Sequence, residues 1–324
     1  MKYSVLKYSE TYFNAWNSFI SSSKNGTFLF HRDFMEYHND RFEDFSLLVF
    51  EKNKLVAVLP ANRSAEKVYS HQGLTYGGLV YNEKLKQAAV LSVFKCVLQF
   101  LHENNISALQ VKQIPYIYHR LPSQETEYAL FLANATMFRR DALSVIESSS
   151  MPKIASNRME GIKKGMANGY IVKQSDDFAS FWETLLMPNL EARHGAKPVH
   201  TAEEIIKLKN TFPNNIKLYI IENEGRIKAG TVLFETDTVV HAQYISAADD
   251  KNETGSLDFL FYHLITKEFI HKKYFDFGIS NEEQGRKLNE GLAFWKESYG
   301  ARTVTQDFYE VETINHTLLE GVLI

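Results

Sequence analysis

The sequence predicts a mixed α/β protein built from two similar domains, residues 1–150 and 151–324. Three observations support this prediction. A chain of 324 residues is long for one domain and comfortable for two. The order strand, polar turn, strand, helix, strand occurs once in each half. A serine run ending at Pro152 has the composition of a linker between the halves.

The first half begins with two expected helices, at residues 9–22 and 31–38. A β-hairpin follows, and its two apolar strands flank the polar turn at 51–54. The apolar residues of 84–102 recur with helical spacing and predict a long amphipathic helix. The segment after Asn105 is expected to be a strand.

The second half repeats this order. Residues 217–234 predict a hairpin, 238–247 another strand, 256–271 a helix and 274–279 a strand. A last helix is expected over 284–299. We interpret the repetition as an internal duplication of one α/β unit.

The net charge, the cysteine count and the apolar segments of the sequence bear on its partners and its compartment. The net charge of −3 gives no global attraction to DNA or to anionic lipid. The single cysteine, Cys96, excludes an internal disulfide and fits a reducing compartment. No segment resembles a signal peptide or a membrane span, so a cytoplasmic protein is expected.

The sequence lacks the motifs of several common enzyme classes. The triplets HRD at 31–33 and DFG at 276–278 also occur in protein kinases, but the chain has no glycine-rich G-x-G-x-x-G loop. The sequence has no H-E-x-x-H pattern and no cysteine pair, so no metal site is expected. A phosphate-binding P-loop and a G-x-S-x-G nucleophile elbow are also missing from the sequence.

The C-terminal segment carries the most specific pattern. A strand reading FDFGIS is followed by GLAFWKESYG at 291–300. This pair of motifs resembles the C-terminal signature of the FemAB-like branch of the GNAT acyltransferase superfamily, with Trp295 where the family usually has phenylalanine. The segments NRMEGIKKGMANGY, LEARHGAKPVHTAEEIIKL and SHQGLTYGGLV resemble other family segments in the same order.

The resemblance implies two tandem GNAT-like domains, the C-terminal one carrying the active site. It implies a bacterial N-acyltransferase whose acyl donor lies between the strands 238–247 and 274–280. Lys296 would border that gap, although a helical lysine more often lies on the surface with its stem covered. Tyr299 is a candidate general acid, with a core aromatic as the alternative.

Other candidate residues surround the expected gap. His241 and Tyr244 are catalytic candidates on the lining strand and are expected to face opposite sides. For His241 the alternatives are a base and a hydrogen-bonded sheet histidine. The remaining candidates for substrate binding are Arg158, Arg193, Asp276, Gly278, Ser280 and Asn289.

The acyl donor stays open between acyl-CoA and aminoacyl-tRNA. Gly255 and Ser256 occupy the place where acetyl-CoA users of the superfamily hold the diphosphate at a helix N-terminus. Three acidic residues precede them, which disfavours a diphosphate. Characterised FemAB-like transferases use aminoacyl-tRNA, so a tRNA partner remains an alternative, and no tightly bound cofactor is expected.

The sequence therefore predicts transfer of an acyl or aminoacyl group to an amine of an amino sugar, amino acid or peptide, in cell-envelope or polysaccharide synthesis. The competing hypothesis is a non-catalytic binding or scaffold protein that keeps the double fold. The acidic segment 249–253 is the best support for this alternative.

Overall fold

The computed structural model describes residues 2–324, apart from the side chains of Arg193 and His194. The chain forms two compact units. Unit 1 comprises Met1–Asp141 and Thr305–Ile324, and unit 2 comprises Ala142–Val304.

These units differ from the division at residue 150 that the sequence suggests. The last segment of the chain returns to unit 1 because β17 (Arg302–Glu312) pairs antiparallel with β8 (Ala108–Lys112), with Phe308 opposite Lys112. The linker serines fall in unit 2, directly after β9 (Thr136–Glu147).

In unit 1, an antiparallel sheet has the strand order β1-β3-β4-β7. Its strands are β1 (Tyr3–Lys7), β3 (Leu47–Glu51), β4 (Lys54–Leu59) and β7 (Val80–Tyr81). The order β17-β8-β6-β5-β2 continues the unit with β6 (Lys67–Tyr69), β5 (Asn62–Ser64) and β2 (Glu43–Asp44). The helices are α1 (Phe13–Ser22), α2 (Arg32–Met35), α3 (Gln87–Glu103) and α4 (Glu125–Leu132).

The core of unit 1 forms around α3. Its buried residues follow helical spacing, as the sequence predicted, and include Leu91, Phe94, Leu98 and Leu101. They pack against apolar side chains of β3 and β4 in one cluster. The hairpin prediction for this half is thus confirmed.

Unit 2 has the strand order β10-β11-β12-β13-β14-β9. Its strands are β10 (Val172–Ser175), β11 (Ile216–Asn223), β12 (Arg226–Glu235), β13 (Val239–Ala247) and β14 (Tyr274–Ile279). Its helices are α5 (Ser156–Ala167), α6 (Phe178–Phe181), α7 (Met187–His194), α8 (Ala202–Thr211), α9 (Lys251–Thr254), α10 (Ser256–His263) and α11 (Glu290–Glu297). The π-helical turns η6 (Trp182–Leu186) and η7 (Leu264–Glu268) extend α6 and α10.

The two units share one connectivity. In each unit an antiparallel hairpin, β3–β4 or β11–β12, is followed by further strands, then by α3 or α10, and then by β8 or β14. Unit 1 has three strands between the hairpin and its helix, β5, β6 and β7, whereas unit 2 has β13 alone. The predicted α/β class with a duplicated unit is confirmed.

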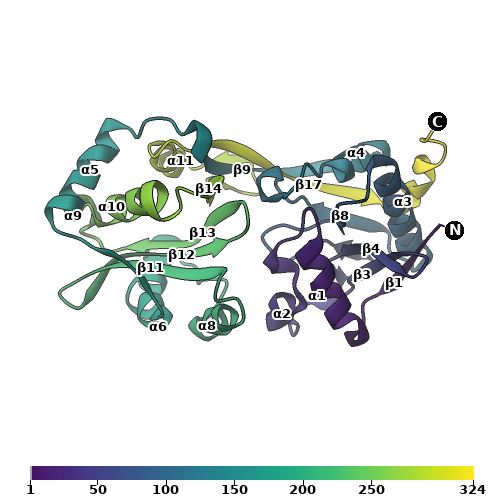
Figure 1. Ribbon diagram of the computed structural model, residues 1–324, viewed down its shortest axis with the longest axis horizontal. Coiled ribbons are helices and arrows are strands. Elements are labelled where there is room, and N and C mark those ends of the chain that lie inside the picture. The colour runs from purple at the N-terminus through teal and green to yellow at the C-terminus, as the bar shows by residue number, and fades with distance from the viewer. Residues whose placement is uncertain (1) are drawn as a thin grey trace. The chain divides into compact units, whose positions relative to one another are not determined.

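Figure 1 shows the layers of unit 2. Helices α5 and α10 cover one face of β11–β13, and α6 and α8 cover the other. The α10 face encloses a large aromatic and aliphatic core that includes Phe261, Phe275 and Phe277. On the opposite face, Trp182 is fully buried and donates its indole N–H to the carbonyl of His200.

Helices α5 and α10 approach each other through glycines. A Cβ at Gly161 would lie 1.9 Å from Oδ2 of Asp258, and a Cβ at Gly165 would lie 2.4 Å from Cβ of Phe259. Gly255, with φ of +69°, starts α10 against the carbonyl oxygen of Gly161. The backbones pack this closely because none of these positions has a side chain.

The helix predicted over 284–299 is shorter than expected. α11 begins at Glu290, and a small hairpin of β15 (Asn281–Glu282) and β16 (Lys287–Leu288) precedes it. Glu283 and Gln284 have φ of 48° and 55° in the turn, which a right-handed helix does not allow. Asn289 caps α11 by accepting a hydrogen bond from the backbone N–H of Leu292 at 3.0 Å.

Candidate active site

Strands β13 and β14 separate partway along their length. They pair in parallel at only three positions, Val239 with Tyr274, Val240 with Phe275 and His241 with Asp276. β13 then continues for six residues to Ala247 without a β14 partner among the described residues. The predicted slot between these strands is therefore confirmed.

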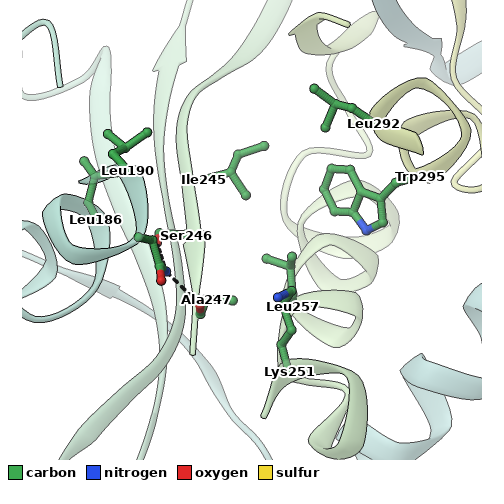
Figure 2. Close-up of a pocket in the computed structure, with 10 residues that line it drawn as sticks. Leu186, Leu190, Ile245, Ser246, Ala247, Lys251, Leu257, Leu292 and Trp295 are labelled. Atoms are coloured by element: carbon green, nitrogen blue, oxygen red, sulfur yellow. Dashed lines mark hydrogen bonds between the residues drawn. The ribbon is translucent and has the colours of Figure 1, made fainter. Parts of the chain in front are cut away.

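A pocket lies where the strands have parted. We call it the strand-gap pocket, and its volume is about 280 Å³. Its lining residues are Leu186, Asn189, Leu190, Ile245, Ser246, Ala247, Lys251, Leu257, Leu292 and Trp295. Figure 2 shows Ile245 of β13 pointing towards Trp295 of α11 across the pocket. The lining is mostly apolar, so the pocket suits an apolar chain or linker.

A bulge in β13 decides which side chains face this pocket. Val232 pairs with Tyr244 and Leu233 with Ala242, so Gln243 is an extra residue. The extra residue shifts the alternation, and both Ala242 and Ile245 pack into the α10 face. The prediction that Tyr244 and His241 face opposite sides is wrong, because this shift places both on the face of α6 and α8.

On that face, Tyr244 is held between two aromatic groups. Its ring lies edge-on to Trp182 with centroids 5.0 Å apart. Its hydroxyl accepts the backbone N–H of His200 at 3.1 Å and lies 2.6 Å from Nδ1 of the same residue. Sequence analysis did not single out His200.

His241 and Asp276 meet at the last paired position of the two strands. Nδ1 of His241 lies 2.9 Å from Oδ2 of Asp276, and Asp276 is fully buried. Oδ1 of Asp276 accepts the backbone N–H of Gly278 at 2.7 Å. Gly278 has φ of +73°, a conformation that glycine adopts without strain.

Lys296 reaches the end of β14 from α11. Its ammonium donates to the carbonyl oxygens of Gly278 at 3.1 Å and Ile279 at 2.5 Å. The residue is only 3% exposed, and burial lowers the pKa of Lys296 to about 8, although the charge of Asp276 opposes this shift. An ammonium group has three donors, so one N–H is left for a ligand.

The lowered pKa of Lys296 predicts a pH dependence of stability. Between pH 8 and about 10.5 the folded lysine is largely neutral while the unfolded one is still charged, so the unfolded state binds more protons. The free energy of unfolding should therefore rise with pH across this window, by up to about 3 kcal/mol from this group. We expect Lys296→Met to remove that part of the rise in urea unfolding curves measured from pH 7.5 to 10.

Lys112 provides the matched control. Burial also lowers its pKa to about 8, and it donates to the carbonyl oxygen of Leu74 in unit 1. Lys112→Met should remove its own share of the rise and leave the share of Lys296 in place. An unchanged pH slope in Lys296→Met would contradict the assignment of a lowered pKa to Lys296.

Tyr299 and Arg158 are brought together, but away from the strand-gap pocket. Tyr299 is fully buried in the α10 core, and its hydroxyl lies 3.2 Å from Oδ1 of Asp258. Arg158 donates to the same Asp258 oxygen at 2.5 Å and to Oγ of Ser298 at 2.9 Å. Burial raises the pKa of Tyr299 well above its ordinary value. These contacts join α5, α10 and α11.

Ser280, Asn289 and Arg193 do not line the strand-gap pocket as far as their side chains are described. Ser280 is buried, and its hydroxyl lies 3.2 Å from that of Ser144. The side chain of Asn289 caps α11 and also donates to Glu282 at 3.0 Å. The side chain of Arg193 lies outside the described residues.

Gly255 and Ser256 do not form an open diphosphate cradle. Ser256 is fully buried, and a Cβ at Gly255 would lie 2.0 Å from the carbonyl oxygen of Gly161. Helix α5 therefore packs where a diphosphate would need access to the start of α10. The nearby Asp250 is paired with Lys228 at 2.7 Å.

Sequence analysis missed most of the pocket lining. Leu186 and Asn189 come from the π-helical turn and α7, far from β13 in sequence. Asn189 donates to Oγ of Ser246 at 2.7 Å and to the carbonyl oxygen of Ala247 at 2.9 Å. No local motif marks this contact, because it depends on the packing of α7 against β13.

Solved structures show which fold this is. The chain matches the crystal structure of FemX with a TM-score of 0.69 and 9% identity, covering 98% of this chain and 99% of that one. This chain has the FemX fold. The predicted FemAB-like fold, with its duplicated α/β unit, is confirmed at the level of the fold.

Other solved structures match this protein with lower TM-scores. A conserved protein of unknown function from Bacteroides thetaiotaomicron has a TM-score of 0.56 and 12% identity, with 95% of this chain and 98% of that chain covered. L-PGS from Bacillus licheniformis has a TM-score of 0.54 and 12% identity, with 82% and 85% covered. No family model and no curated protein matches the sequence.

Membrane-spanning helices and metal-ligand clusters are both missing from the described part of the chain. Among residues 2–324, no helix has both the length and the apolar character needed to cross a bilayer. Among the side chains that the structure describes, no three from His, Cys, Asp or Glu are grouped so that they could hold a metal ion.

Proposed function

We propose that unit 2 is an N-acyltransferase that moves an acyl or aminoacyl group from an activated ester or thioester to an amine. The observation that carries this proposal is the separation of β13 and β14 after His241 and Asp276, with an apolar pocket in the gap. Amide formation needs an electrophilic carbonyl held beside an amine, and a donor for the developing oxyanion.

The pocket volume indicates the size of the donor arm. A cavity of about 150 Å³ binds benzene, so a pocket of about 280 Å³ accommodates roughly ten non-hydrogen atoms of an apolar chain or linker. Leu257, Leu292 and Trp295 would contact this arm from one side, and Ile245 from the other.

Lys296 is the proposed oxyanion donor. Two of its N–H groups are engaged by the carbonyl oxygens at the end of β14, which fixes the position of the third. At pH 7 the group is mainly protonated, because its pKa of about 8 is above the pH. A buried positive charge stabilises a developing oxyanion more strongly than an exposed one.

The donor would be held by its acyl arm and not by a diphosphate. The packing of α5 over Gly255 and the burial of Ser256 argue against the usual CoA diphosphate site. Aminoacyl-tRNA therefore stays a candidate donor. The proposed acceptor is the amine of an amino sugar, amino acid or peptide in cell-envelope or polysaccharide synthesis.

The test is a search for amide products by mass spectrometry. The purified protein is incubated with acyl-CoA thioesters of two to twelve carbons or with a set of aminoacyl-tRNAs, together with amino sugars, amino acids and short peptides. A new amide mass that depends on the protein is the expected result. If no pair yields an amide and no donor raises the melting temperature, the non-catalytic alternative is favoured.

Filling the strand-gap pocket should block donor binding. We expect Leu257→Trp to lower kcat/KM for the donor by at least about 30-fold, equivalent to roughly 2 kcal/mol. Leu288→Trp is the matched control, since Leu288 is 62% exposed and does not line the pocket. Equal activity of the two variants in the steady-state assay, with equal melting temperatures, would argue that the donor lies elsewhere.

A further inference from the structure

We propose that His241 and Asp276 form a general-base dyad in which Asp276 orients the imidazole and His241 takes the proton of the acceptor amine. The dyad rests on the transferase function proposed above for the same site. It assigns Asp276 a positioning role instead of the substrate contact that the sequence suggested.

The aspartate is held rigidly. One of its oxygens faces Nδ1 of His241 at 2.9 Å, and the other accepts the backbone N–H of Gly278 at 2.7 Å. Asp276 is fully buried, so solvent does not compete for these contacts. A carboxylate beside Nδ1 favours the proton on that nitrogen and leaves a lone pair on Nε2.

Nε2 is the free end of this arrangement. No residue that the structure describes hydrogen-bonds Nε2 of His241, and the side chain keeps 12% of its accessible surface. A histidine that served only to join two strands would need no exposed ring nitrogen. The accessible Nε2 is what a base requires in order to reach a substrate proton.

His241 and the pocket-lining side chain of Ile245 lie on opposite faces of the sheet. His241 lies on the sheet face of α6 and α8, whereas Ile245 and Ala247 line the strand-gap pocket on the α10 side. The dyad occupies the last paired position before the strands part. In this proposal the acceptor amine approaches from the face of His241 and meets the carbonyl of the donor at the point where the strands part.

A second charged group acts beside the dyad. The charge of Asp276 acts on Lys296, whose ammonium binds the carbonyl oxygen of Gly278 two residues further along β14. The carboxylate and the ammonium offset each other inside the protein.

Amide formation by the dyad begins with the attack of the amine on the donor. The amine nitrogen bonds to the acyl carbon of the donor ester or thioester, and one amine proton passes to Nε2 of His241. The bond from the acyl carbon to the donor oxygen or sulfur breaks, and the imidazolium returns the proton to that leaving atom. The products are the amide and the free alcohol or thiol, with the dyad restored.

The tautomer of His241 tests the dyad without any substrate. In long-range ¹H–¹⁵N spectra of histidine-labelled protein at neutral pH, we expect a proton on Nδ1 and none on Nε2. His241→Gln identifies the signal among the 11 histidines. Asp276→Asn should shift the population towards the proton on Nε2. A wild-type His241 that carries its proton on Nε2 would overturn the proposal, even if Asp276→Asn does not fold.

Chemical modification and activity give independent readouts. Diethylpyrocarbonate should modify His241 on Nε2, and an unreactive His241 in the folded protein would also overturn the dyad. With an amide-forming pair, His241→Gln should lower kcat by about 10²–10⁴-fold, and imidazole should restore part of the activity of His241→Ala. Retained activity in His241→Gln refutes the dyad alone. Absence of any amide from the wild type refutes the transferase function, and the tautomer and modification results then decide whether a poised base exists.

Discussion

Replacing Lys296 by methionine is expected to lower kcat for amide formation by about 10²–10³-fold and to leave KM for the donor nearly unchanged. The methionine has a similar length but no N–H, so the oxyanion would lose its donor. The proposed place of the donor arm is the strand-gap pocket, whose lining does not include Lys296. The loss should therefore appear in the chemical step and not in donor binding. Single-turnover rates of the wild type and the variant measure this directly.

Lys112→Met is the control for this experiment. Burial lowers the pKa of Lys112 to about 8, as it does for Lys296, but Lys112 is only half-buried and belongs to unit 1. Its removal reproduces the loss of an ammonium with a lowered pKa without touching the proposed site. Comparable losses of kcat in both variants would show that the effect arises from general destabilisation, and the role of Lys296 would have to be abandoned.

The pH dependence of the same rate gives a second check on Lys296. Its ammonium loses its proton as the pH rises past about 8, so kcat should fall above that pH. This fall should disappear in the residual activity of Lys296→Met.

Replacing Gly255 by alanine is expected to lower the free energy of unfolding by about 4 kcal/mol. The new Cβ would lie 2.0 Å from the carbonyl oxygen of Gly161 and 2.8 Å from the backbone nitrogen of Gly165. Helices α5 and α10 would have to move apart, and the residue would also occupy a positive φ of 69°. Urea unfolding monitored by circular dichroism measures the change.

Gly225→Ala separates these two costs. Gly225 has φ of +71°, and a Cβ added there would meet no atom within 4 Å, so alanine suffers only the backbone strain. We expect a loss of about 1 kcal/mol for this variant. If both variants lose the same free energy of unfolding, the added Cβ at Gly255 does not force α5 and α10 apart. The steric argument for a glycine at position 255 would then be wrong.

The sequence by itself determined the elements and their order. The spacing of Leu91, Phe94, Leu98 and Leu101 specifies α3 because residues three and four apart share a helix face. The polar turns between apolar strands specify the two hairpins for an equally local reason. The repetition of this pattern and the motif around Lys296 are enough to point to the FemX-like fold.

The tertiary structure alone decided which of these residues face a common site. The bulge at Gln243 reverses the alternation of β13, and no propensity or periodicity in the sequence marks it. The contact of Asn189 with Ser246, the pairing of Asp276 with His241 and the burial of Tyr299 against Asp258 all join segments distant in sequence. Local patterns encode helices and strands because their hydrogen bonds and apolar faces are local. The gap between β13 and β14 arises from how whole elements pack, and that packing is a property of the folded chain.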